Sequence, residues 1–286
     1  MIPTNPFIQS LDNFILSALT EDIGDGDHTS LSTIDIAKND KAIIKIKEKG
    51  IISGLKVAER IFQLADSSLK IETHFNDGDV VNVNDIALII SGNTRNLLKS
   101  ERLALNCLQR MSGISTLTGR YVAAVQGTGV NILDTRKTTP NFRQFEKTAV
   151  LAGGGMNHRF GLFDMILIKD NHVDAAGGIK NALLKAERYL HQSGKKLLIE
   201  IETRNLEEVI EVLQTKIANR IMLDNFQPEL LKEAVKLIDN RLETEASGGI
   251  TLDNIGAYAE TGIKYISVGA LTHTYKSLDI SMKLTR

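Results

Sequence analysis

Cationic side chains are concentrated between residues 134 and 172 of this 286-residue chain. An arginine guanidinium suits two-point recognition of planar carboxylates and phosphates, and a lysine ammonium supplies a compact point charge. A lone arginine or lysine is usually a solvated surface charge, but Arg136, Lys137 and Lys169 follow apolar runs that predict buried strands. Their placement predicts a site for a small polyanion. The cationic and potentially cationic residues of this stretch are Arg136, Lys137, Arg143, His158, Arg159 and Lys169.

Two acidic residues, Glu202 and Asp224, end the next two apolar runs. Paired carboxylates beside bound phosphates are a common way for a protein to hold Mg²⁺, which keeps several of its own waters. The alternative is that each carboxylate pairs with a neighbouring lysine or arginine. We expect contact with Mg²⁺ or with a ribose. Glu200 would share a strand face with Glu202, so only their depth in the sheet distinguishes them.

Small residues follow the last two apolar runs. Ser247-Gly248-Gly249 leads toward a helix that starts near Leu252, and Gly269-Ala270 follows the final run. Glycine lets backbone N–H groups approach phosphate oxygens, and many α/β barrels bind phosphate after their last two strands. One such tripeptide would indicate only a turn, whereas two in these places predict a phosphate site. For His273, which follows the second, phosphate contact and an exposed loop position are both open.

Six short apolar runs in the second half of the chain predict the parallel strands that position these side chains. A strand buried on both faces is almost entirely apolar, so polar residues at successive carboxyl ends are placed for chemistry. Segments with helical spacing, such as 182–190 and 206–213, alternate with the runs. This favours an α/β barrel, because the glycine-rich fingerprint that a doubly wound sheet often carries is missing. The runs are 131–133, 165–168, 197–201, 221–223, 242–246 and 265–268.

The first third of the chain is organised differently. Strand patterns dominate it, beginning with the run 42–47, which starts apolar and then alternates as a half-exposed strand does. They predict an N-terminal, sandwich-like α/β domain over residues 1–112, ending after a helix from about Asn96 to Met111. The barrel domain with the active site is expected at 113–272. A C-terminal tail, 273–286, is expected to pack back toward the N-terminal domain.

Composition limits the possible functions. The chain is 42% hydrophobic and 24% charged, as in an ordinary folded protein, and its formal net charge of −1 gives no general attraction for nucleic acid. No apolar stretch has the length of a membrane span, and Met1 to Ser10 lacks the pattern of a secretory signal, so a cytoplasmic location is expected. Cys107 is the single cysteine, which excludes an internal disulfide, and a buried thiol is expected there.

Motifs along almost the whole chain carry a family resemblance. In chain order they are Glu21-Asp22, Gly26-Asp27, Glu101-Arg102, Asp134-Thr135-Arg136-Lys137-Thr138, Asn157-His158-Arg159, Ile168-Lys169-Asp170-Asn171-His172, Leu223-Asp224-Asn225-Phe226 and Ser267-Val268-Gly269-Ala270-Leu271. Together they resemble the quinolinate phosphoribosyltransferase family, also called nicotinate-nucleotide pyrophosphorylase (carboxylating). The resemblance implies a type II phosphoribosyltransferase fold, in which an α/β N-terminal domain precedes an incomplete, open α/β barrel. It also implies a homodimer or a larger assembly such as a hexamer.

The family reaction is a pentosyl transfer in NAD synthesis. It joins quinolinate to 5-phosphoribosyl-1-pyrophosphate and gives nicotinate mononucleotide, pyrophosphate and CO₂. Quinolinate carries two adjacent carboxylates, which the cationic cluster could hold. The implied substrate-binding residues are Arg102, Thr135, Arg136, Lys137, His158, Arg159 and Lys169. The implied catalytic residues are Glu202, Asp224, Lys137 and Lys169, of which Glu202 and Asp224 would also hold Mg²⁺. The implied phosphate-binding residues are Ser247, Gly248, Gly249, Ser267, Val268, Gly269 and Ala270.

The resemblance gives Arg102 a role that its own surroundings do not suggest. Arg102, Asn106 and Gln109 share one helical stripe opposite Leu103, Cys107 and Met111, which is the ordinary pattern of a solvated helix face. In the family, the matching arginine completes the substrate site of the other subunit. Activity would then depend on dimerisation.

Three other functions remain open from the residues. A barrel aldolase could use Lys169 as a Schiff-base amine, since a buried lysine with a depressed pKa serves that role. A nucleotide sensor could keep the phosphate site without turnover, although intact acidic and basic sets argue against it. A related phosphoribosyltransferase could act on nicotinate or another heterocycle, which would require fewer cations than this cluster offers.

Overall fold

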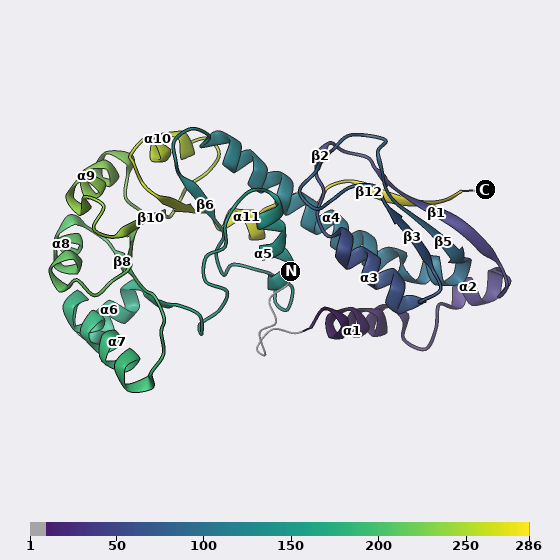
Figure 1. The fold of residues 1–286 in the computed structure, drawn as a ribbon, viewed down its shortest axis with the longest axis horizontal. Helices are drawn as coiled ribbons and strands as arrows, with labels where there is room; N and C mark the ends of the chain where they lie inside the picture. The colour runs from purple at the N-terminus through teal and green to yellow at the C-terminus, as the bar shows by residue number, and fades with distance from the viewer. Residues whose placement is uncertain (1–9, 286) are drawn as a thin grey trace. The chain divides into compact units, whose positions relative to one another are not determined.

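The computed structural model describes residues 10–285 (Figure 1). These residues form two compact units. No helix in this described part of the chain is both long enough and apolar enough to cross a membrane. The first unit consists of residues 10–119, 139–154 and 274–285, and the second consists of residues 120–138 and 155–273.

The segment 139–154 belongs to the first unit, whereas the sequence-based domain boundaries assigned it to the barrel. It contains helix α5 (Arg143–Ala152). Phe142, just before this helix, packs with Phe14 and Phe145, and the ring centroids lie 4.5 to 5.6 Å apart. Apolar contacts between residues distant in the chain leave no change of composition at a boundary, so the sequence did not reveal this crossing.

An antiparallel sheet forms the core of the first unit, in the order β12-β1-β5-β3. Its strands and the small pair β2-β4 are β1 (Asn39–Ile46), β2 (Gly50–Ile51), β3 (Lys70–Thr73), β4 (Val80–Val81), β5 (Ile86–Asn93) and β12 (Ile280–Thr285). Alternate residues of β1, Ala42, Ile44 and Ile46, are buried, as the alternating sequence predicts. Strand β12 of the C-terminal tail pairs with β1 from Lys41–Thr285 to Ile46–Ile280. The other helices of this unit are α1 (Leu11–Ile23), α2 (His28–Thr33) and α3 (Leu55–Ala65).

Helix α4 runs from Thr94 to Ala124, so the predicted helix end at Met111 was wrong. Ser112-Gly113 resembles a helix break, but the helix continues through it. The Thr116 hydroxyl donates to the Ser112 carbonyl at 2.7 Å, a bond within the helix. A Cβ added to Gly113 would lie 2.3 Å from the backbone oxygen of Lys276. The glycine therefore permits close packing against a neighbouring segment and does not end the helix.

The two faces of α4 differ in the way that the sequence predicts. Cys107 and Met111 are 2% and 1% exposed, whereas Arg102 and Asn106 are exposed. Burial raises the pKa of the Cys107 thiol to about 12, so the thiol stays protonated. The expectation of a buried, unreactive cysteine is confirmed.

Six parallel strands form the second unit, and its helices follow the last five of them along the chain (Figure 1). The strands are β6 (Asn131–Leu133), β7 (Ile166–Ile168), β8 (Ile199–Thr203), β9 (Arg220–Asp224), β10 (Glu243–Ser247) and β11 (Tyr265–Ser267). The helices are α6 (Asp170–Ala176), α7 (Ile179–Ser193), α8 (Leu206–Thr215), α9 (Pro228–Ile238), α10 (Ile255–Ala259) and α11 (Ala270–His273). The strand order is β6-β11-β10-β9-β8-β7 and every neighbouring pair is parallel. This confirms the predicted open α/β barrel, and the carboxyl ends of its strands share one edge.

Gly113→Ala should destabilise the protein, because the new Cβ would meet a backbone oxygen that cannot rotate away. We expect the free energy of unfolding to fall by about 1–3 kcal/mol, as for overpacked interiors, in urea denaturation. Gly256→Ala in α10 is the matched control, since no neighbouring atom lies within 4 Å of its added Cβ. That variant should be unchanged or more stable by up to about 1 kcal/mol. Equal stabilities of the two variants would contradict the close contact at Gly113.

Candidate active site

A cavity of about 810 Å³ lies at the carboxyl ends of the barrel strands. Every site residue that the sequence predicted within the second unit lines it. These are Thr135, Arg136, Lys137, His158, Arg159, Lys169, Glu202, Asp224, Ser247, Gly248, Gly249, Ser267, Val268, Gly269 and Ala270. The structure thus brings together side chains from all six strand ends.

Two candidates from the sequence lie in the first unit. Arg143 belongs to the cationic stretch but begins α5, a helix of the first unit. Unlike Arg136, Lys137 and Lys169, it follows no predicted strand, and the chain leaves the barrel unit between residues 139 and 154. Arg102 is exposed on α4 of the same unit. The role of Arg102 at a substrate site stays a prediction.

The guanidinium groups of Arg136 and Arg159 form the cationic wall of the cavity. Arg159 donates through one terminal nitrogen to the Met165 carbonyl at 3.2 Å. The Nε–H groups of both arginines are buried and have no hydrogen-bond partner among residues 10–285. Burial, together with the neighbouring charge of Arg136, lowers the pKa of Arg159. Two like charges with buried donors still available provide the conditions in which a bound anion is stabilised.

Lys169 and Glu202 form an ion pair across the ends of β7 and β8. The Lys169 Nζ lies 2.9 Å from one carboxylate oxygen of Glu202, and the Asp170 N–H donates to the other oxygen at 3.3 Å. The alternative that Glu202 pairs with a neighbouring cation is therefore realised in this structure. The Lys169 side chain remains 47% exposed, so its ammonium also faces the cavity.

Asp224, at the end of β9, is a half-buried carboxylate beside Glu202. Burial, and then the charge of Glu202, raise the pKa of Asp224. The Asn225 side chain donates to Asp224 at 2.7 Å. Two carboxylates that repel each other at a cavity wall form a donor set that a hard divalent cation would stabilise.

The turn after β10 needs its glycines. Gly248 and Gly249 have φ angles of +96° and +63°, which side-chain-bearing residues rarely adopt. A Cβ added to Gly248 would also lie 2.2 Å from the Asn225 side-chain oxygen. The turn after β11 is crowded too, since a Cβ at Gly269 would approach His273 and Lys137 to 3.0 Å. These turns bring backbone to the cavity wall, as the predicted phosphate site requires, and they also place His273 in the lining.

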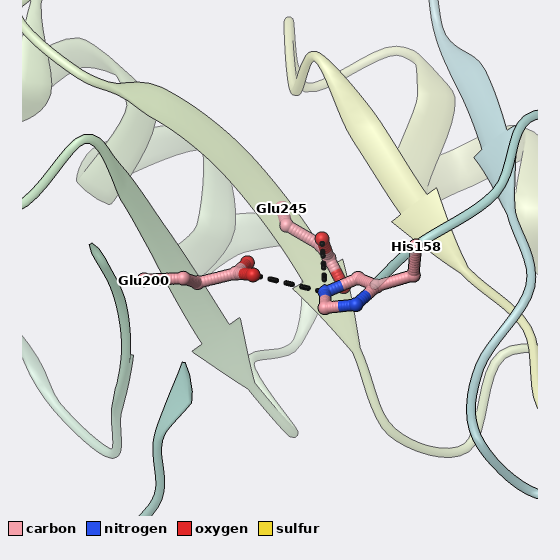
Figure 2. Close-up of side chains that lie close together, drawn as sticks. All are labelled: His158, Glu200 and Glu245. Atoms are coloured by element: carbon pink, nitrogen blue, oxygen red, sulfur yellow. Dashed lines mark ion pairs between the residues drawn. The ribbon is translucent and has the colours of Figure 1, made fainter. Parts of the chain in front are cut away.

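At the cavity wall, His158 lies between two buried glutamates, on the strands that flank β9 on either side (Figure 2). Its Nε2 is 2.9 Å from Glu200 of β8 and 3.4 Å from Glu245 of β10. Both glutamates are 0% exposed. Arg220, at the start of β9, contacts Glu245 at 3.3 Å. The depth of the two β8 glutamates is thus resolved, with Glu200 inside the barrel and Glu202 at the cavity.

Sequence reasoning missed Glu245 and Arg220. A signal was present, because Glu243 and Glu245 alternate along a run that was expected to be a buried strand. Further lining residues that were not predicted as site residues are Leu167, Asp170, Met222, Asn225, Glu245, Ile250 and Thr251.

An open parallel barrel with cations, paired carboxylates and glycine turns around one cavity defines an α/β-barrel enzyme for anionic substrates. Comparison with known proteins identifies the family. Residues 27–112 match the N-terminal domain model of quinolinate phosphoribosyl transferase, and residues 114–283 match its C-terminal domain model. The chain belongs to the quinolinate phosphoribosyltransferase family, whose decarboxylating transfer of a phosphoribosyl group serves NAD biosynthesis.

Individual relatives agree with the family assignment. Quinolinate phosphoribosyltransferase [decarboxylating] 2b, mitochondrial, of Nicotiana tabacum is 48% identical over 93% of this chain and 80% of its own length. A probable nicotinate-nucleotide pyrophosphorylase [carboxylating] of Bacillus subtilis is 42% identical over 96% of this chain and 92% of its own length. The crystal structure of NadC from Streptococcus pyogenes superposes with a TM-score of 0.93 at 39% identity, covering 100% and 99% of the two chains.

Glu200 should make stability depend on pH. Burial, and then the charge of Glu245, raise the pKa of Glu200 from 4.5 to about 7. The folded state then binds this proton more tightly than the unfolded state does. The resulting stabilisation is complete below the unfolded pKa of 4.5 and is lost as pH rises through about 7.

Glu200→Gln removes this equilibrium, so the Tm of the variant should fall less than that of the wild type between about pH 5 and about pH 8. Thermal unfolding at several pH values measures this. Glu243→Gln is the control, because Glu243 lies outside the His158 contact and pairs with Arg220 and Lys264. A Glu200→Gln profile as steep as that of the wild type would refute the raised pKa.

Proposed function

We propose that the cavity of the second unit binds quinolinate beside 5-phosphoribosyl-1-pyrophosphate and forms nicotinate mononucleotide, pyrophosphate and CO₂ there. One observation carries the assignment of the dicarboxylate to this cavity. Arg136 and Arg159 both line it, and both have buried Nε–H groups with no acceptor in the described part of the chain. An unsatisfied buried donor costs free energy, which a carboxylate acceptor would recover. Two adjacent carboxylates on one ring could serve both guanidinium groups.

The phosphoribosyl transfer requires no covalent bond to the enzyme. The pyridine nitrogen forms a bond to C1 of the ribose as the bond from C1 to the pyrophosphate oxygen breaks, and pyrophosphate carries away the electron pair. Positive character develops on the ribose meanwhile, and the carboxylates of Glu202 and Asp224 are placed to stabilise it. Lys137 and Lys169 line the same cavity and supply positive charge to the departing pyrophosphate.

We propose Glu202 and Asp224 as the residues that hold Mg²⁺. Their oxygen donors suit this hard cation, and the repulsion that contributes to the raised pKa of Asp224 would be relieved by it. Bound Mg²⁺ would offset charge on the pyrophosphate. Lys169 already contacts Glu202 at 2.9 Å, so Asp224 is the carboxylate more available to the cation.

The glycine turns would hold the phosphate groups. Ser247 ends β10 and is followed by Gly248 and Gly249, while Ser267 ends β11 and is followed by residues 268–270. Both segments border the cavity that the arginines line. Gly249 in particular leaves room for an anion against the backbone, since no neighbouring atom lies within 4 Å of the place of its missing Cβ. We propose that the 5-phosphate of the ribose binds between these two segments.

Decarboxylation needs mainly positioning. Once the ring nitrogen is bonded to ribose, the ring is cationic and can stabilise the electron pair left on carbon when the neighbouring carboxylate departs as CO₂. That carbon then takes a proton. The protein contributes by holding the ring, through the carboxylate that stays, against Arg136, Arg159 and the nearby lysines.

The ion pair of Lys169 disfavours the aldolase alternative. A Schiff-base lysine must present a neutral amine, usually in a desolvated pocket. Lys169 instead is paired with Glu202 at 2.9 Å and its side chain is 47% exposed, so it does not lie in a desolvated pocket. Borohydride with a carbonyl substrate should therefore leave Lys169 unmodified.

The purified protein, given quinolinate, 5-phosphoribosyl-1-pyrophosphate and Mg²⁺, should release nicotinate mononucleotide and CO₂, and removal of Mg²⁺ by chelation should stop the reaction. Arg159→Lys should raise the KM for quinolinate about tenfold or more, because a two-point contact is lost. Arg204→Lys is the matched control, since Arg204 follows β8 but pairs with Glu208 outside the cavity. Product with nicotinate but not with quinolinate would show that the enzyme is specific for another heterocycle. Absence of product from both substrates would overturn the proposal.

We further propose a homodimer, or a hexamer built from dimers, in which Arg102 completes the substrate site of the partner subunit, as the resemblance implies. Its exposure on α4 is compatible with this role. Arg102→Ala should then lower kcat/KM for quinolinate at least tenfold while the dimer stays intact in analytical ultracentrifugation. Asn106→Ala, on the same exposed stripe, is the control. Full activity of Arg102→Ala would contradict the shared site.

The cytoplasmic location expected from the sequence is also a proposal. The Nicotiana tabacum relative carries "mitochondrial" in its name, and the relative from Arabidopsis thaliana carries "chloroplastic". The Bacillus subtilis relative names no organelle. Fractionation of source cells with an antibody against this chain would locate it.

A further inference from the structure

The group formed by His158, Glu200 and Glu245 lies inside the barrel, where the proposed reaction assigns it no role (Figure 2). The side chain of His158 is only 6% exposed, and the two glutamates are fully buried. These side chains also resemble a ligand set for a cation, with their donor atoms within 4.8 Å of one another. Arg220, 3.3 Å from Glu245, already supplies positive charge there, which disfavours a bound metal.

Both ring nitrogens of His158 have protein partners. The Arg159 backbone N–H donates to Nδ1 at 2.8 Å, and Nε2 faces Glu200 at 2.9 Å and Glu245 at 3.4 Å. The His158 backbone is held as well, since its N–H donates at 2.9 Å to the buried Asp134 at the end of β6. The ring therefore has no N–H directed at the cavity, although its residue borders the cavity wall.

The Arg159 N–H determines where the ring proton lies. Burial lowers the pKa of His158, but the contacts with Glu200 and Glu245 outweigh burial, and together these influences would bring the pKa to about 9. A second proton would have to occupy Nδ1, whose lone pair already accepts the Arg159 N–H. The arrangement consistent with every contact is a neutral ring with its one proton on Nε2, directed at the glutamates.

We propose that Glu200 and Glu245 are positioning residues for the quinolinate site: they hold His158 as a neutral Nε2–H ring, which in turn fixes Arg159 at the cavity wall. This rests on the proposed function of the cavity. The chain of contacts runs from Arg220 through Glu245 and the His158 ring to the Arg159 amide. His158 thus acts through Arg159 and does not donate a ring N–H to the substrate.

The buried charges of Glu200 and Glu245 would serve to orient Arg159. Arg159 can bind a planar carboxylate at two points only if its guanidinium is held in one orientation. Its backbone amide is tied to the ring, and its side chain to the Met165 carbonyl. Loss of the carboxylate that orients the ring would loosen the first of these ties. Binding of the dicarboxylate should then weaken through residues that do not contact it.

Glu245→Gln tests this, because it keeps the shape of the side chain and removes its charge. We expect the KM for quinolinate to rise about tenfold or more, with the KM for 5-phosphoribosyl-1-pyrophosphate and kcat within about twofold of the wild type. Glu243→Gln is the matched control. Glu243 lies on the same strand and contacts the same Arg220, at 3.1 Å, but belongs to neither His158 contact. It should leave all three constants unchanged.

The proton position is measured separately, on the wild-type protein. Long-range ¹H–¹⁵N NMR distinguishes the ring states, and the His158 signals are assigned by their loss in His158→Asn; the chain has six histidines. We expect the neutral Nε2–H form at neutral pH. A ring protonated on both nitrogens, or on Nδ1 alone, would overturn the proposal even if Glu245→Gln does not fold.

The kinetic result can also overturn it. Wild-type constants for Glu245→Gln, or an equal loss in kcat and in both KM values, would show that Glu245 does not act on quinolinate binding through Arg159. If the wild type does not turn over quinolinate, the proposed function itself fails. The NMR measurement would still report whether His158 is held as described.

Discussion

The parallel direction of all six barrel strands is the constraint on which the site depends. Because the strands run the same way, their carboxyl ends reach one edge, and side chains from six separate stretches of chain border one cavity. A strand of opposite direction would place its final residues at the other edge. Helices α6 to α10 return the chain after strands β7 to β10, which is how Lys169 and Glu202 come within 2.9 Å of each other. The common direction of the strands is therefore what brings the residues of the site together, and no single residue does so.

Charge inside the barrel is a second feature with a physical cost. Inward positions of such barrels are usually bulky and apolar, yet here Glu200, Glu245 and His158 are buried together beside Arg220. Buried ion pairs seldom add stability relative to apolar residues of similar volume, although removal of one partner is costly. Their presence is better explained by orientation than by stability. His158 holds the Arg159 backbone N–H at the cavity wall, where we propose that the arginine guanidiniums present a defined geometry to a planar anion.

Much of the fold was predictable because each barrel strand is a local pattern, an apolar run that ends in polar residues. The strands β6 to β11 and the lining residues that follow them were predicted for this reason. The length of α4 was not, because Gly113 serves a close approach to Lys276 that a linear sequence does not show. The placement of 139–154 in the first unit depends likewise on aromatic contacts with Phe14. Local rules identify elements, whereas contacts between distant segments decide where elements end.

The sequence by itself determined the family, the open barrel and the set of charged residues at its edge. Residue types and their spacing carry this information, since strand periodicity and the motifs at strand ends are local properties. Only the tertiary structure decided the partner of each charge. Glu200 and Glu202 have the same side chain on the same face of one strand, and the fold places one against His158 and the other against Lys169. The depth of a carboxylate in the barrel determines whether it is solvated, whether it is paired and whether its pKa is raised. A residue is buried to a given depth only after the six strands have come together.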